Sequence, residues 1–425
     1  MGTVLRSLRS VEQPAGSTNV RFEGRTVRAV TEAEILLQAG DIEIDCAGKL
    51  ATSGFINAHT HLAMVLFRGL ADDVPLDVWL EDHIWPIEAK LSPEDIYWCT
   101  LLAIAESVRG GTVAFADMYF HVDAIAQAVE ESGVRALLSY GMIASTLDRK
   151  GISELSKTEE LIKRWHGAAN GRIQVAVSPH TLYTCGEDVW KKAVELARDA
   201  ELKIHTHVSE TRRETDEWRE EMGESPVASL KRLGALEGPL LAAHCVHVDD
   251  QDIALLATHD VAVAHCPKSN AKLGSGIAPI TEMCDAGVSV AVGTDGAASN
   301  NRLDMIEEMR TVWVLQRARN ESAMKPSADD VVRMATENGR QALGLGVGGL
   351  TEGGAADLVL FDTDRLHTTP SHDPASLVAY AADGLDVTDV IVDGRWLMKD
   401  GELLTIDEER VKSEVTRLLD RHRKS

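Results

Sequence analysis

The stretch Gly54-Phe55-Ile56-Asn57-Ala58-His59-Thr60-His61 joins a mostly apolar run to two histidines at its end. In an extended strand, residues i and i+2 point to the same face, so His59 and His61 direct two imidazoles to one point. A pair of zinc ligands must be arranged in this way. The stretch therefore predicts a buried strand that ends, at the mouth of a core, in one half of a metal site.

Apolar runs alternate with amphipathic segments from residue 54 to about residue 350. Six of the runs are predicted to be buried strands, at 111–117, 173–177, 203–207, 240–244, 261–265 and 288–292. The segments 187–200 and 329–343 have helical character. Alternation of this kind over about 300 residues indicates an α/β fold with a parallel sheet, and a (β/α)8 TIM-like barrel accounts for it best.

The segments on either side of this region are rich in short β-like runs. These runs are 20–22 and 41–44 before the barrel, and 356–361 and 389–394 after it, with a helical tail at 407–422. We expect segments 1–53 and 351–425 to meet in one small composite β-sandwich domain, interrupted in sequence by a catalytic barrel of residues 54–350.

The composition excludes several classes of protein. No long uncharged apolar run is present, so we expect no membrane span, and the N-terminus lacks the pattern of a secretory signal. Six scattered cysteines without a C-x-x-C pair favour reduced thiols in a cytoplasmic protein. A formal net charge of −24 argues against nucleic acid as a partner, because proteins that bind nucleic acid carry basic patches.

Several chemically active side chains fall at the ends of predicted strands, namely His61, His180, His207, His244 and Asp295. Active sites of barrels are built on that rim. Imidazoles with one carboxylate suit zinc or ferrous iron, and a water bound to such a metal has its pKa lowered toward ~7. Glu210, three residues beyond His207, can reach a substrate proton without binding the metal, as a general acid/base must.

Other features carry less weight. His205 shares a strand face with His207, and we expect it to pack deeper or to support the ligands. His247 and His265 are each expected to be structural. The tract Gly344–Gly349 does not lead from a strand into a helix, so we interpret it as the barrel's exit linker and not as a nucleotide loop.

The chain resembles the amidohydrolase superfamily over almost its whole length, and within it the methylthioadenosine/S-adenosylhomocysteine deaminases, which include 5′-deoxyadenosine deaminases. Beside residues 54–61, the resemblance rests on 67–73, 85–88, 117–120, 243–247, 270–279 and 293–301. The last of these, Gly293-Thr294-Asp295-Gly296-Ala297-Ala298-Ser299-Asn300-Asn301, is the most characteristic. The resemblance implies hydrolytic conversion of the adenine of 5′-deoxyadenosine, 5′-methylthioadenosine, S-adenosylhomocysteine or adenosine to the inosine derivative, with release of ammonia.

The resemblance also implies the roles of individual residues. One metal per subunit, usually zinc with ferrous iron as the alternative, would be held by His59, His61, His207 and Asp295. Three residues would act in catalysis: His244 by hydrogen-bonding the attacking water, Glu210 by protonating the purine ring, and Asp295 by accepting the water proton. Glu88 would bind the ribose hydroxyls, and His180 would contact the purine. The family further implies a homo-oligomer, a tetramer, acting in S-adenosylmethionine metabolism.

One position departs from the family pattern. Some members that hold a homocysteine tail carry arginine where this chain has Tyr140, and tyrosine cannot reproduce the planar fork with which arginine grips a carboxylate. Arg149 is another candidate for that contact. Tyr140 therefore favours substrates with a short, uncharged 5′ end, although an aromatic residue of the barrel wall without substrate contact fits equally well.

Three other interpretations fit the sequence less well. A triazine or guanine-like amino- or chloro-hydrolase could use the same scaffold, because fold alone does not fix the substrate. A dinuclear hydantoinase-type enzyme is disfavoured, since residues 174–179 offer no lysine to bridge two metals. A catalytically inactive scaffold would have lost a ligand or the acid, whereas every position is intact.

Overall fold

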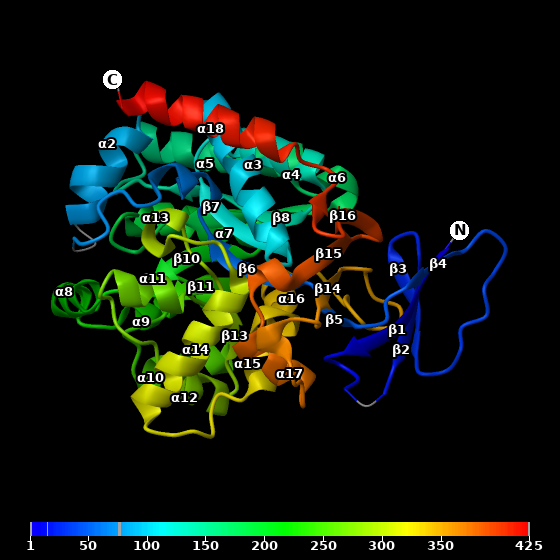
Figure 1. Cartoon of the computed structure of the whole chain (residues 1–425). Helices are drawn as coiled ribbons and strands as arrows, with labels where there is room; N and C mark the ends of the chain where they lie inside the picture. Colours follow the sequence, from blue (N-terminus) through cyan, green and yellow to red (C-terminus); the bar gives the residue numbers. More distant parts are fainter. Residues whose placement is uncertain (1, 15, 75–77, 424–425) are drawn as a thin grey trace.

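A computed structural model of the chain describes residues 2–14, 16–74 and 78–423. Eight parallel strands at its centre follow one another in chain order, β6 to β13 (Figure 1). They are β6 (Phe55–Thr60), β7 (Thr112–Tyr119), β8 (Arg135–Met142), β9 (Ile173–Pro179), β10 (Ile204–Val208), β11 (Leu240–His244), β12 (Ala262–His265) and β13 (Ser289–Val292). The six predicted strands are all present, and the predicted barrel is confirmed.

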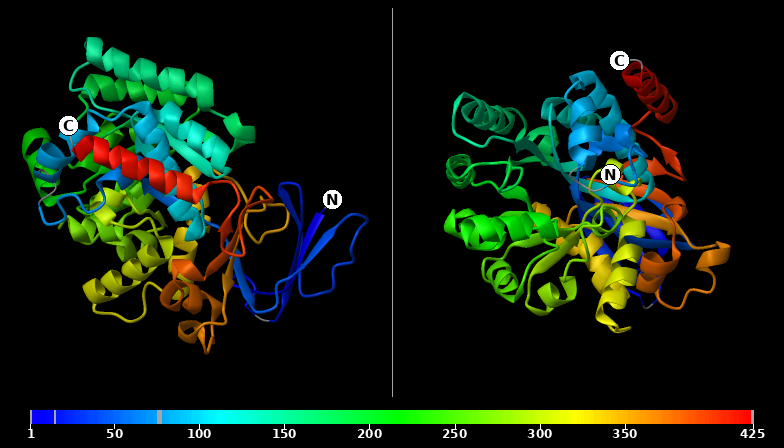
Figure 2. Two further views of the ribbon diagram at one scale, coloured as in Figure 1. Left: turned by 45° about the horizontal axis from the view of Figure 1, so that its top comes forward. Right: turned by 90° about the vertical axis from the view of Figure 1, so that its left-hand side faces the viewer.

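Helices lie around the outside of these strands (Figure 2). The longer ones are α3 (Pro93–Arg109), α4 (Val122–Ser132), α5 (Arg149–Trp165), α7 (Glu187–Asp199), α8 (Arg212–Met222), α10 (Asp250–Thr258) and α14 (Met305–Asn320). The predicted helix 187–200 corresponds to α7. The predicted helix 329–343 is divided into α15 (Ala328–Ala335) and α16 (Glu337–Leu343), because Thr336 leaves the helical conformation and its hydroxyl bonds the Val332 carbonyl.

The barrel closes between its first and last strands without a strand ladder in the described part of the chain. A single backbone bond spans the seam, from the Asp295 amide to the His59 carbonyl (2.9 Å). The side chain of Asn57 adds two further bonds, to the amide (3.0 Å) and the hydroxyl (2.7 Å) of Thr294. Gly293 lets the two backbones approach, since a Cβ there would lie 2.8 Å from both the amide nitrogen and the carbonyl oxygen of His59.

The two ends of the chain form a second sheet beside the barrel (Figure 1). Its strands are β1 (Gly2–Ser10), β2 (Thr18–Glu23), β3 (Thr26–Thr31), β4 (Ile42–Asp45), β5 (Lys49–Ser53), β14 (Leu358–Asp362), β15 (Val387–Val392), β16 (Arg395–Lys399) and β17 (Glu402–Leu403). The order is β17-β16-β15-β14-β5-β1-β2-β3, with β4 on β1. The sandwich expected of these segments is thus one mixed sheet around a small core of its own, to which β1, β2, β5 and β14 all contribute. The domain limits 1–53 with 351–425 and 54–350 stay a prediction.

Contacts between the two parts are both helical and ionic. The C-terminal helix α18 (Glu408–Arg423) packs along α3 of the barrel (Figure 1). Asp357, which precedes β14 and is fully buried, accepts from Arg135 (2.9 Å) and Arg340 (2.9 Å) of the barrel. None of the helices described here is both long and apolar enough to cross a lipid bilayer.

The seam gives a first prediction. Gly293→Ala places a Cβ against backbone atoms of His59, which cannot move aside as a side chain can, so we expect a loss of about 1 to 3 kcal/mol in the free energy of unfolding. Urea denaturation measures this loss. The matched control is Gly238→Ala, where nothing lies within 4 Å of the added Cβ. Equal stability of the two variants would contradict this account of the seam.

Candidate metal centre and active site

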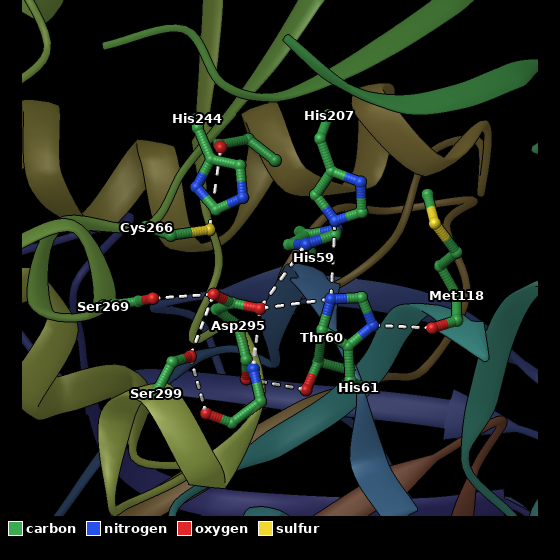
Figure 3. Close-up of polar contacts among 12 residues, drawn as sticks. His59, Thr60, His61, Met118, His207, His244, Cys266, Ser269, Asp295 and Ser299 are labelled. Atoms are coloured by element: carbon green, nitrogen blue, oxygen red, sulfur yellow. Dashed lines mark hydrogen bonds and ion pairs between the residues drawn. The ribbon is translucent and has the colours of Figure 1, made fainter. Parts of the chain in front are cut away.

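Three imidazoles converge at the C-terminal end of the barrel, and each comes from or directly follows a strand. His59 lies on β6, His61 follows it, and His207 lies on β10. Their ligand nitrogens all lie within 4.8 Å of one another. His59 is fully buried, and His207 nearly so. The barrel thus brings residues of β6 and β10, which are not paired with each other, to one point (Figure 3).

The hydrogen bonds of the rings fix which nitrogen of two of them is free to bind a cation. Nδ1 of His61 faces the Met118 carbonyl (2.6 Å) and Nδ1 of His207 faces the His180 carbonyl (2.9 Å). A carbonyl only accepts, so both Nδ1 atoms carry a proton, and each ring in its neutral form presents a bare lone pair at Nε2. These two Nε2 atoms lie 3.4 Å apart (Figure 3). Two lone pairs facing each other at that distance need a cation between them.

His59 completes the set. Its Nδ1 contacts Nε2 of His205 (2.8 Å), which confirms that His205 supports a ligand from below. Its own Nε2 is buried without a hydrogen-bond partner among the described residues. Buried polar atoms seldom lack a partner, so this nitrogen marks a place for a bound ion. The donor set of three imidazole nitrogens fits zinc or ferrous iron.

Asp295 lies on the open side of the three imidazoles, just after β13. Its Oδ1 is 3.2 Å from Nε2 of His61 and 3.6 Å from Nε2 of His59. The hydroxyls of Ser269 (2.6 Å) and Ser299 (2.9 Å) donate to Oδ2 and hold the carboxylate in place (Figure 3). Burial would raise the pKa of Asp295, but the hydrogen bond to His61 and the neighbouring imidazoles hold it well below its usual range.

Electrostatics also require a positive charge in this cluster. Burial, together with the other rings, holds the pKa of His59 and His207 well below the ordinary value. Burial acts in the same direction on His61, but Asp295 raises the pKa of His61 to about 9. The ionised carboxylate therefore draws one cation into the cluster, a proton on His61 or a metal, and the two compete.

A second carboxylate stands across from Asp295. Glu210 follows β10, and its Oε2 lies 3.6 Å from Nε2 of His244, with 14% of the side chain exposed. Burial, reinforced by the charge of Asp295, raises the pKa of Glu210 to about 8. Glu210 therefore holds a proton at neutral pH. Asn270, in turn, contacts Nδ1 of His244 (3.0 Å).

The turn that carries Glu210 is fixed by backbone bonds. The amide of Glu210 donates to Oε2 of Glu214 (2.9 Å), which also closes the capping box of α8 with Thr211. The carbonyl of Ser209 accepts from the amides of Val246 (3.1 Å) and His247 (2.9 Å), beyond β11. Backbone bonds between the segments that follow β10 and β11 therefore set the position of Glu210 relative to His244.

Strained backbone clusters at these same strand ends. Ser209, His244, Cys245 and Asp295 all have positive φ, between 48° and 74°. L-residues adopt such angles at a cost of order 1–3 kcal/mol each, and they persist only where surrounding structure enforces them. The rim is thus built to direct these side chains inward, at the expense of local stability.

A cavity opens above the metal centre. His61, His207, His244, Glu210 and Asp295 form its floor. Its walls and roof include Met64, Trp79, Leu80, Ile84, Trp85, Glu88, Tyr119, Phe120, Ile143, His180, Tyr183, Leu273 and Ser299. The residues predicted to contact substrate thus meet in one place, with one exception. Tyr140 lies in an adjoining cavity, which Arg149 does not line.

Two polar residues of the walls are already engaged. Glu88 ends the short helix α2 (Trp85–Glu88) and accepts from the hydroxyl of Tyr119 (2.5 Å), and burial raises its pKa. Nδ1 of His180 contacts the hydroxyl of Thr184 (3.2 Å). Burial, with the nearby imidazoles, lowers the pKa of His180 to about 3, so the ring is neutral and presents a nitrogen to the cavity.

Comparison with known proteins fits this geometry. Residues 50–397 match the model of the amidohydrolase family. The chain belongs to this family. It is 46% identical to 5′-deoxyadenosine deaminase of Methanothermobacter thermautotrophicus over 90% of each chain, and 47% identical to a 5-methylthioadenosine/S-adenosylhomocysteine deaminase of Dictyoglomus thermophilum over 88% of each. The zinc-bound crystal structure of an adenosine deaminase from Xanthomonas campestris is 33% identical and superposes with a TM-score of 0.93, covering 100% of this chain and 99% of the other.

Sequence reasoning did not assign every residue that builds this amidohydrolase site. Ser269 and Ser299, which hold Asp295, fall within or beside matched motifs but had no assigned role. Glu214 was not identified, although Thr211-x-x-Glu214 has the pattern of a capping box. Lys157 and Glu154 of α5, beside Tyr140, carried no signal, because charged residues on an amphipathic helix usually face solvent.

The metal centre can be tested by metal content. We expect purified protein to hold about one equivalent of zinc or iron, and His207→Ala to lose it, since one of three clustered imidazoles is removed. His265→Asn is the matched control, because His265 is a buried imidazole at the end of another barrel strand, β12, and stands outside the cluster. Elemental analysis by mass spectrometry gives the result, and equal metal in both variants would contradict the assignment.

Proposed function

We propose that this amidohydrolase removes the amino group from the adenine of 5′-deoxyadenosine, 5′-methylthioadenosine, S-adenosylhomocysteine or adenosine. The products are the corresponding inosine derivative and ammonia. The observation that carries the proposal is the pairing of a three-imidazole centre with a carboxyl group, Glu210, on one cavity floor. Support for these substrates comes from the two deaminases that match nine-tenths of the chain.

We propose that His59, His61, His207 and Asp295 hold one zinc ion, with ferrous iron as the alternative. When bound, such a metal lowers the pKa of water and so supplies a nucleophile near neutral pH. Asp295 remains ionised inside the cavity and has one oxygen directed at the imidazoles, so it can accept a proton there. Ser269 and Ser299 donate to the other carboxylate oxygen, Oδ2, and so hold the carboxylate in place while the proton moves.

Glu210 and His244 would act on the substrate side. A nucleophile that adds to the carbon bearing the amino group leaves extra electron density on the neighbouring ring nitrogen. Glu210 is protonated at neutral pH and can donate to that nitrogen, and because its pKa lies near the working pH it can also take a proton back. His244, 3.6 Å from Glu210, would orient the attacking water. Ammonia leaves once the amino group has taken up the proton that Asp295 accepted from the water.

The rest of the nucleoside would be held by the cavity walls. Glu88 has a carboxylate at the cavity edge that can accept hydrogen bonds from vicinal ribose hydroxyls. The neutral ring of His180 would contact the purine. The aromatic residues Trp79 and Trp85 supply apolar surface for the base and sugar. A cytoplasmic homotetramer is the assembly we propose, and light scattering of the purified protein tests its size.

The pH profile follows from Glu210. Its pKa is raised to about 8, so the proton-donating form is present below pH 8 and is lost as the pH rises through that value. We expect kcat/KM to decline above about pH 8. Glu210→Gln should keep its metal and lose activity ~10²–10⁴-fold at pH 7. Glu217→Gln, which removes an exposed carboxylate paired with Arg213 in the same helix, serves as the control. Near-normal turnover by Glu210→Gln would refute this role.

The substrate class is tested with metal-loaded protein and a panel of compounds. The four adenosine derivatives are compared with guanine and a chlorinated triazine, by the change in ultraviolet absorbance and by the ammonia released. We expect equimolar ammonia and inosine derivative from adenosine derivatives only. Turnover of guanine or the triazine, with none of the four adenosine derivatives, would overturn the proposal.

A further inference from the structure

The proposed substrates share one adenosine core and differ at a single position. The 5′ carbon carries only hydrogen in 5′-deoxyadenosine, a methylthio group in 5′-methylthioadenosine, and a homocysteine with a carboxylate and an ammonium group in S-adenosylhomocysteine. Choice among them must therefore be made where the 5′ end lies. With the purine over the metal centre and the ribose at Glu88, the 5′ end lies beyond Glu88.

A second cavity begins at that point. It shares Trp85, Glu88, Tyr119, Phe120 and Ile143 with the cavity above the metal centre. Its volume of about 620 Å³ would take a homocysteine tail as readily as a methylthio group. Size alone therefore does not select the substrate, and the charges of the walls must do so.

The two cationic side chains that line this cavity, Lys157 and Arg164, are each paired with a carboxylate. Five charged residues line it, namely Glu88, Asp123, Lys157, Glu160 and Arg164. Arg164 pairs with Asp123 (2.8 Å). Lys157 is bound by a carboxylate that lies behind the wall, because its Nζ contacts Oε1 of Glu154 at 2.9 Å.

Glu154 is fixed where it holds Lys157. Its side chain is only 7% exposed. The hydroxyl of Tyr140 donates to Oε1 (3.1 Å) and accepts from Nζ of Lys157 (2.8 Å), while the amide of Ile143 donates to Oε2 (3.4 Å). Lys157 also lies over the Tyr140 ring, 4.9 Å from its centroid. Each of Tyr140, Glu154 and Lys157 thus contacts the other two, and the three are called the Tyr140 triad here.

We propose that the Tyr140 triad makes this enzyme select adenosine derivatives with a short, uncharged 5′ group over S-adenosylhomocysteine. This inference rests on the proposed function. A substrate carboxylate that enters the second cavity meets a lysine already paired with Glu154, an arginine already paired with Asp123, and the further acid Glu160. It would have to compete with Glu154 and Asp123 for these two cations, so its charge gains little from entering. A hydrogen or methylthio group meets no such cost.

The triad is tested by releasing its lysine. Glu154→Gln keeps the size of the side chain and removes the charge that neutralises Lys157. We expect the ratio of kcat/KM for S-adenosylhomocysteine to that for 5′-methylthioadenosine to rise about tenfold or more, and to fall back in Glu154→Gln/Lys157→Met. The matched control is Glu195→Gln, which breaks a similarly spaced but exposed pair with Lys192 on α7 and should leave the ratio unchanged.

The outcomes separate this inference from the proposed function. The wild type should prefer 5′-deoxyadenosine and 5′-methylthioadenosine, and this measurement stands even where Glu154→Gln does not fold. If no adenosine derivative is deaminated by metal-loaded protein, the proposed function fails. If all are deaminated and S-adenosylhomocysteine is the best of them, or if the ratio in Glu154→Gln equals that in the wild type, only the role of the triad is overturned.

Discussion

The site depends above all on the closure of the barrel between its first strand and its last. One backbone hydrogen bond, from the Asp295 amide to the His59 carbonyl, joins two residues that would hold the same metal. Gly293 makes that approach possible, and Asn57 fastens the seam with its side chain. The predicted metal site therefore depends on closure, because His59 and Asp295, more than two hundred residues apart, are brought together by the same contacts that complete the barrel.

The imidazoles are then oriented from behind. His205, the Met118 carbonyl and the His180 carbonyl each engage one Nδ1 atom, which leaves the Nε2 atoms facing one another. Hydrogen bonds of this kind to the outer nitrogen fix both the tautomer and the ring orientation of metal-binding histidines. The positive φ angles at the strand ends show that the rim is held in place against its local preference. The site is preorganised, and the cost is borne by packing elsewhere in the barrel.

Much of this could be predicted from the sequence, because buried parallel strands have a strong apolar signature and His59-Thr60-His61 carries a two-residue spacing that a strand converts into geometry. Strand β8 was not predicted, because Ser139 and Gly141 interrupt its apolar run. The break at Thr336 depends on one hydroxyl bond. The seam bond and the Tyr140 triad join segments through long-range contacts that no local pattern records, so only the folded chain shows them.

We predict that closure of the barrel assembles a single metal site from residues at the C-terminal ends of β6, β10 and β13. X-ray diffraction from crystals of the metal-loaded protein, collected at the absorption edge of zinc, tests it most directly. We expect one anomalous peak, bonded to Nε2 of His59, His61 and His207 and to Oδ1 of Asp295. Two peaks in the site, or a single peak that Asp295 does not contact, would contradict the claim.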